Sequence, residues 1–167
     1  MGYKRKMKKI YICILFTLFV YSLCAQSNDC LKYVSDEAYY RYTAIGCQQI
    51  VNNNHAKAIN ESRKIANVKA ENELAKMLEI AVTKAITRMT EESDAYADFY
   101  IDTMLVSTSK VIKGMKTICQ SKTELVGNMY VTNVTKEISI DNISKMLNFE
   151  KDKDRNKFIK ILKNINK

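Results

Sequence analysis

The chain has 167 residues and a formal net charge of +9, from 27 Lys and Arg against 18 Asp and Glu. This charge is confined to the two ends, because residues 4–9 hold five basic residues and residues 150–167 carry a net +4. Residues 26–149 are therefore neutral, and a nucleic-acid-binding body with a basic stripe is excluded. The length is enough for one domain with a hydrophobic core and too short for two.

The N-terminus has the pattern of an export signal. A basic stretch over residues 4–9 is followed by residues 10–25, which contain no charge. This apolar run suits a signal sequence and is shorter than the roughly 20 residues that a membrane-spanning helix needs. We expect residues 1–25 to be a signal peptide cleaved after Ala25, and the protein to reach the periplasm or outer envelope, or to be secreted. An uncleaved anchor and lipidation of Cys24 are the alternatives, although Leu23 is larger than the residue a lipidation motif places before its cysteine.

After a polar lead-in, a strand and a long helix are predicted. Residues 39–45 are rich in aromatic and β-branched side chains and end at Gly46, which favours a strand. Residues 52–54 are three asparagines, which are good helix N-caps. Apolar residues then recur at helical spacing: Ala56, Ile59, Ala66, Ala70, Leu74, Met77, Ala81 and Ala85. Such an alanine-rich stripe predicts a helix lying flat and close on a sheet.

A second helix and a hairpin are predicted next. The second helix runs from Asp94 to Gly114. The pair Gly127-Asn128 favours a two-residue hairpin turn, because glycine accepts the positive φ of a type II′ turn. Counting outward from that turn pairs Leu125 with Tyr130, Cys119 with Lys136, and Thr117 with Ile138. Residues of one face are mixed to apolar and those of the other are polar, so we expect a ribbon with one solvated face.

The C-terminal part is predicted to be a last helix capped by Asp141 or Asn142. Its end, residues 156–165, is a basic amphipathic segment. One interpretation is peripheral contact with an anionic membrane, with lysines on the surface and apolar side chains inserted: Lys157, Lys160, Lys163, Phe158, Ile161 and Ile165. The alternative is that the apolar side packs on the domain itself.

Together these elements predict one α+β domain. A small antiparallel sheet is covered by the long alanine-rich helix and a second helix, with a C-terminal helix following. The predicted organisation is a signal peptide at 1–25, the domain at 26–149, and the basic amphipathic segment at 150–167.

Three cysteines remain beyond the predicted signal peptide: Cys30, Cys47 and Cys119. In an oxidising compartment Cys47 and Cys119 are a candidate disulfide if their strands are neighbours, with isolated buried thiols as the alternative. No two of these cysteines are separated by two intervening residues, the C-x-x-C spacing that zinc sites use.

Nothing in the chain assembles a recognisable catalytic, cofactor or metal site. His55 is the single histidine, which excludes a histidine-based triad and a histidine-rich metal site. The carboxylate pairs Glu71–Glu73 and Glu91–Glu92 are expected to be solvated. Residues two apart on a helix point to different sides, which separates the first pair, and the second pair lies in a predicted turn. No glycine-rich phosphate loop is present. We therefore expect no enzymatic activity and no cofactor.

The order of these motifs resembles the LPP-twenty family of bacterial surface lipoproteins over roughly residues 40–143. The resemblance is carried by Ala44-Ile45-Gly46 and then Arg63-x-x-Ala66-x-x-x-Ala70-x-x-x-Leu74. It differs from the family pattern in Gly46-Cys47-Gln48, where a glycine pair is common, and in the poor lipidation motif. The resemblance implies an α+β fold and an envelope or surface location. The family has no established catalytic residues, so the resemblance assigns none to this chain.

The expected function is thus that of a non-catalytic, exported cell-envelope protein that binds or scaffolds an envelope protein or cell-wall component. The alternative is a soluble periplasmic protein that binds a small molecule in an apolar pocket between helix and sheet, near Tyr96, Phe99 and Tyr130. Tyrosines elsewhere in the chain could also form the rim of a glycan or peptide groove or simply flank the core: Tyr33, Tyr39, Tyr40, Tyr42 and Tyr100.

Overall fold

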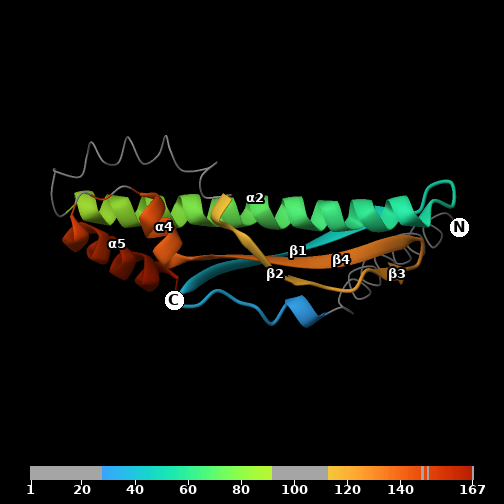
Figure 1. Cartoon of the computed structure of the whole chain (residues 1–167), viewed down its shortest axis with the longest axis horizontal. Helices are drawn as coiled ribbons and strands as arrows, with labels where there is room; N and C mark the ends of the chain where they lie inside the picture. The colour runs from blue at the N-terminus through green and yellow to red at the C-terminus, as the bar shows by residue number, and fades with distance from the viewer. Residues whose placement is uncertain (1–27, 92–112, 148, 150, 167) are drawn as a thin grey trace, which may run out of the picture.

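The computed structural model describes residues 28–91, 113–147, 149 and 151–166. Its elements in chain order are η1 (Asn28–Cys30), β1 (Tyr39–Gln49), α2 (His55–Thr90), β2 (Lys116–Gln120), β3 (Glu124–Val126), β4 (Met129–Ser139), α4 (Ile140–Met146) and α5 (Asp152–Ile165). The molecule is elongated, with α2 lying along one face of an antiparallel sheet (Figure 1). The predicted α+β fold is confirmed. The predicted signal peptide, with Cys24, and nearly all of the predicted second helix lie outside the described residues.

The sheet has the strand order β1-β4-β2, with β3 also paired to β4. Strand β4 is thus the central strand. Strand β1 pairs with it without interruption from Tyr39 opposite Ser139 to Gln49 opposite Met129. The strand therefore continues three residues beyond Gly46, where the sequence pattern predicted its end.

The hairpin forms as predicted near its turn and differs from the prediction farther away. Gly127 has φ +61°, and Leu125 lies opposite Tyr130. Cys119, however, lies opposite Thr135, and Thr117 opposite Lys136. The β2–β3 arm has one extra residue between Gln120 and Glu124 and another between Thr117 and Cys119. Each extra residue reverses which way the following side chains face, so a register counted from the turn fails beyond it.

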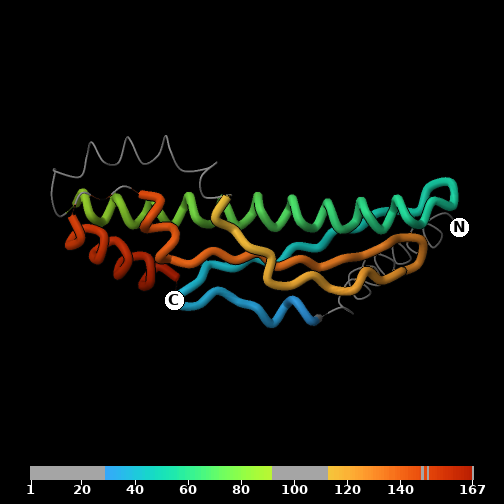
Figure 2. The backbone as a smooth tube through the Cα atoms, viewed as in Figure 1, coloured from blue at the N-terminus to red at the C-terminus, as the bar shows by residue number. Residues whose placement is uncertain are grey.

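Helix α2 begins as the asparagines predict. The Asn54 side chain accepts a hydrogen bond from the Lys57 backbone N–H at 3.0 Å, while Asn52 and Asn53 adopt positive φ in the preceding turn. With 36 residues the helix is about 54 Å long. It extends beyond the sheet and continues alongside α5 (Figure 2).

The contact between α2 and the sheet is made by small residues. A Cβ added at Gly46 would lie 2.0 Å from the carbonyl oxygen of Ser62 and 2.5 Å from the backbone nitrogen of Ala66. Ala66 and Ala70 are completely buried and pack with Ala44 and Val134. The alanine stripe thus brings the helix backbone directly onto β1, as the sequence predicts.

The predicted last helix is two helices. Strand β4 runs straight into α4, so Ser139 is the cap and accepts a hydrogen bond from the Asn142 backbone N–H at 3.1 Å. The predicted caps, Asp141 and Asn142, lie inside the helix. Helix α5 packs Phe158 and Leu162 into the larger core, beside the second half of α2. The apolar side of the segment 156–165 is therefore used within the domain.

Candidate functional site

The sheet face away from α2 is covered by residues 28–36, which we call the cover segment. Asn133 and Thr135 of β4 point to this face and are 1% and 0% exposed. The expectation that this face of the ribbon is solvated is wrong at these positions. The cover segment, which lies more than 90 residues earlier in the chain, crosses β4 there and buries these side chains. This contact belongs to the tertiary structure and is not encoded in the local pattern of the strand.

A disulfide between Cys30 and Cys119 holds the cover segment on the sheet, with the two Cα atoms 5.5 Å apart. The predicted pairing of Cys47 with Cys119 is wrong. β1 and β2 flank β4 on opposite sides, so their Cα atoms are about 10 Å apart across the sheet. Cys47 also lies opposite Val131, four residues along β4 from the partner of Cys119. A disulfide needs Cα atoms within about 7 Å.

Threonines reinforce the disulfide. The Cys30 carbonyl accepts hydrogen bonds from Thr43 at 3.2 Å and Thr135 at 3.1 Å, and the two threonine hydroxyls are 2.7 Å apart. The cover segment is thus bound to both β1 and β4 through polar side chains. The hydrophobic clusters of the domain, in contrast, lie on the α2 side of the sheet.

Arg41 fastens the end of the cover segment. Its guanidinium binds Glu137 at 2.9 Å, Asp36 at 2.5 Å, and the carbonyl of Val34 at 2.8 Å. The pKa of Asp36 is lowered by the backbone N–H of Ala38 and by Arg41. These ion pairs and this hydrogen bond hold the cover segment against the sheet, and the cluster has no feature of a reactive centre.

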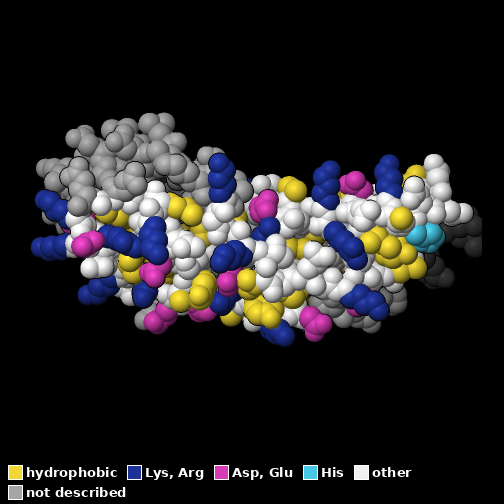
Figure 3. All heavy atoms as spheres, in the orientation of Figure 1, with side chains coloured by type: hydrophobic (Ala, Val, Ile, Leu, Met, Phe, Trp, Pro, Cys, Tyr) yellow, Lys and Arg dark blue, Asp and Glu magenta, His cyan; other side chains and the backbone are white. Residues whose placement is uncertain are grey.

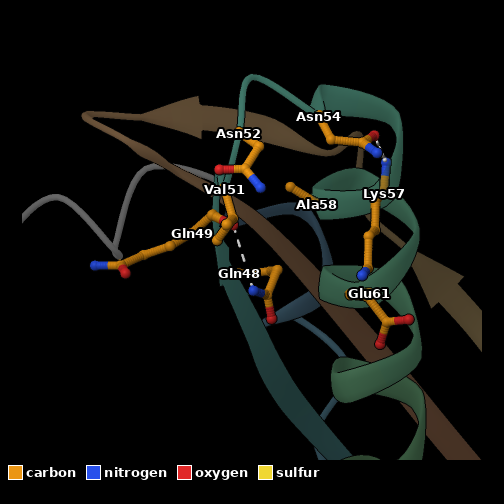
Figure 4. A pocket seen from close by; sticks show the side chains of 8 residues that line it. All are labelled: Gln48, Gln49, Val51, Asn52, Asn54, Lys57, Ala58 and Glu61. Carbon is orange, nitrogen blue, oxygen red and sulfur yellow. Dashed lines mark hydrogen bonds between the residues drawn. The ribbon is translucent and has the colours of Figure 1, made fainter.

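A small cavity of about 270 Å³ lies where β1 ends and α2 begins (Figure 4). Its lining is mostly amide and charged side chains: Gln48, Gln49, Val51, Asn52, Asn54, Lys57, Ala58 and Glu61. Gln48 donates to the carbonyl of Gln49 at 3.3 Å, and Asn54 caps the helix. The cavity can hold a polar ligand by hydrogen bonds.

This cavity is not the apolar pocket of the alternative prediction. That pocket was expected beside Tyr130, which does not line the cavity, and beside Tyr96 and Phe99, which lie outside the described residues. Near Gly46 the helix and the sheet are in backbone contact, which leaves no room for a ligand between them.

His55 is exposed at the first residue of α2, as a surface histidine was expected to be. Its Nδ1 lies 3.1 Å from the hydroxyl of Tyr130, and the two rings meet edge to face. A general base needs a substrate proton to accept and a group that orients it. Here the hydrogen-bond partner of the imidazole is the hydroxyl of Tyr130.

A charged pair connects α2 to the sheet near its middle. The Lys136 ammonium lies 2.7 Å from the Glu71 carboxylate, with the two side chains 8% and 31% exposed. The expectation that Glu71 is a solvated surface charge is therefore wrong, since the even-numbered face of β4 points at α2. Glu73 does pair at the surface, with Lys76.

The described tyrosines lie in different surroundings. Tyr40 is buried and Tyr42 packs against the core. Tyr39 lies against the Arg41 guanidinium, and Tyr33 against the Lys32 ammonium. The interpretation that these residues flank the core fits Tyr40 and Tyr42.

Over the described ranges, no group of three His, Cys, Asp or Glu side chains is arranged to hold a metal ion. None of the helices in those ranges is long and apolar enough to cross a bilayer. No protein-family model matches this chain, and no curated protein matches it.

Proposed function

We propose that this chain is an exported, non-catalytic protein of the cell envelope, a binding or scaffolding module of the LPP-twenty type. The observation that carries the proposal is the Cys30–Cys119 disulfide, which joins residues 89 apart in the sequence. Stable disulfides of this kind belong to oxidising compartments. The apolar run that precedes the domain supplies a route to such a compartment.

Binding is favoured over catalysis by the chemistry of the described side chains. The cavity at the start of α2 presents amides and one pair of opposite charges, which can recognise a polar surface. Arg41 and Lys136 are engaged in ion pairs that fasten the fold. A protein or cell-wall partner suits such a surface, because hydrogen bonds to exposed amides add specificity to a contact without requiring a deep pocket.

The proposal is tested by fractionating cells that express the full chain and measuring the intact mass of the product. A chain that begins at Gln26, lies outside the cytoplasm and is two mass units lighter than its fully reduced form is the expected result. A mass that includes acylated Cys24 keeps the export proposal and makes the protein lipid-anchored. Full-length, reduced protein in the cytoplasm would overturn it.

The binding role is tested by capture from envelope extract with cross-linking. The wild-type chain is compared with a variant in which Gln48, Gln49 and Asn52 are changed to Ala. A matched control changes three exposed polar residues far from the cavity, Asn156, Asn164 and Lys151, to Ala. Loss of a cross-linked species in the first variant alone is expected. Measurable turnover of a hydrolase substrate would contradict the non-catalytic proposal.

A further inference from the structure

Helix α5 carries three lysines on its outward side, Lys153, Lys160 and Lys163, which we call the lysine stripe. All three are exposed. Their spacing of seven and three residues places them on one side of a helix, and they extend over about 15 Å. Asp152 and Asp154, the acidic residues of α5, lie in its first turn. Lys and Arg side chains are visible at the end of the molecule that α5 forms (Figure 3).

The opposite side of α5 is committed to the core. Phe158 and Leu162 are completely buried, and Ile161 and Ile165 pack against the same cluster. Insertion of these side chains into a membrane would require α5 to leave the domain. The apolar side chains of α5 are therefore not free to insert into a membrane while the protein is folded, as those of an isolated amphipathic helix would be.

The lysine stripe is not neutralised by the part of the chain that the structure describes. Within those ranges none of its three ammonium groups has a carboxylate within 4.0 Å. The tail from residue 150 carries a net +4 beside a neutral body. Three exposed ammonium groups thus lie on the outward side of α5, with Asp152 and Asp154 next to Lys153 in the first turn.

We propose that the lysine stripe docks the domain on an anionic phospholipid surface by electrostatic attraction, with no insertion of side chains. This rests on the proposed function, since export brings the protein to the envelope membranes. Each lysine near an anionic bilayer adds to binding, and the attraction is screened by salt. A nucleic acid fits less well, because the stripe is short and the rest of the domain is neutral.

The test is flotation of the chain from Gln26 onward, which retains every described helix and strand, with vesicles. One preparation is pure phosphatidylcholine and the other contains about 30% phosphatidylglycerol. Binding is expected only to the anionic vesicles, in 50 mM NaCl, and to be lost in 500 mM NaCl. Changing Lys153, Lys160 and Lys163 together to Gln should weaken it at least tenfold and up to about a hundredfold.

Two controls make the result specific. Changing Lys64 and Lys69 of α2 and Lys122, which follows β2, to Gln removes the same charge from exposed positions elsewhere and should leave most of the binding. Changing the stripe to Arg should preserve it. Circular dichroism confirms that each variant is folded.

Four results would overturn the inference: no binding to anionic vesicles, salt-independent binding, equal losses in the two glutamine variants, or tighter binding to duplex DNA than to the vesicles. The vesicle assay is independent of where the cell sends the protein. If the protein is exported but does not bind the anionic vesicles, the docking inference is wrong and the proposed function is unaffected. If it binds the vesicles but stays in the cytoplasm, the proposed function is wrong and the docking inference is unaffected.

Discussion

Gly46 of β1 lies directly beneath the backbone of Ser62 in α2, at a distance that admits no side chain. A Cβ at this position would be 2.0 Å from the Ser62 carbonyl oxygen. The obstructing atoms belong to the helix backbone and cannot rotate away. Ser62 itself is buried, and its hydroxyl lies 3.0 Å from that of Thr132, the residue paired with Gly46 on β4. The two layers are thus in direct contact at Gly46 and Thr132.

Replacing Gly46 with Ala should destabilise the domain by about 3 kcal/mol, because α2 would have to move off β1. Urea unfolding followed by circular dichroism measures the change. Gly127→Ala is the matched control, since nothing lies within 4 Å of a Cβ there and only its positive φ is unfavourable. That control should cost about 1 kcal/mol. Equal losses in the two variants would contradict the steric explanation.

Cys30→Ser should lower the free energy of unfolding by up to about 4–5 kcal/mol, because the disulfide closes a loop of 89 residues in the unfolded chain. The cover segment should then become sensitive to trypsin at Lys32. Unfolding in the presence and absence of a reductant is the measurement. Cys47→Ser, which leaves the disulfide in place, is the control and should keep the wild-type response to reductant. A wild-type protein indifferent to reductant would refute the pairing.

Glu71→Gln should cost about 2 kcal/mol, because it leaves the Lys136 ammonium, 8% exposed, without its carboxylate. Replacing both residues with Leu and Met, respectively, should recover most of this loss, since two apolar side chains avoid the cost of burying charge. A double-mutant cycle based on thermal unfolding separates the two effects. If the loss of stability in the double variant equals the sum of the losses in Glu71→Leu and Lys136→Met, the two residues are not coupled.

Tyr40 should make the domain sensitive to alkali. Burial raises the pKa of its phenol from 10.0 to about 12. The unfolded chain therefore releases this proton at lower pH than the folded chain, and stability that is complete below pH 10 is lost as the pH rises towards 12. The difference between the folded and unfolded pKa values contributes at most about 2–3 kcal/mol of stability. Tyr40→Phe should flatten this part of the stability curve, measured by urea unfolding between pH 9 and 12. A variant with the wild-type slope would assign the effect to another group.

Several features of the fold could be predicted because short-range geometry encodes them. Asn54 caps α2 through a side chain that reaches a backbone group three residues away. Gly127 turns the hairpin by accepting positive φ. The alanine stripe and Gly46 together specify a close contact between helix and strand, since both remove the side chains that would keep them apart.

The hairpin register and the partner of Cys119 could not be predicted in the same way. An alternation with a period of two predicts which residues of a strand share a face. The single extra residue at Ile118 reverses the assignment of faces beyond that point. The disulfide depends on β4 lying between β1 and β2, and on a lead-in that returns across the sheet. Neither property leaves a local pattern in the chain.

The sequence by itself determined the class of fold, the long helix and where it begins, the turn of the hairpin, and the concentration of positive charge at the ends. Tertiary structure alone decided that Cys30 pairs with Cys119, that Thr135 and Lys136 are buried, and that α5 uses its apolar side on the core. Local backbone preferences act over three or four residues and are therefore encoded in the sequence itself. Burial and pairing depend instead on contacts between segments that are distant in the sequence, and these contacts form only in the folded domain.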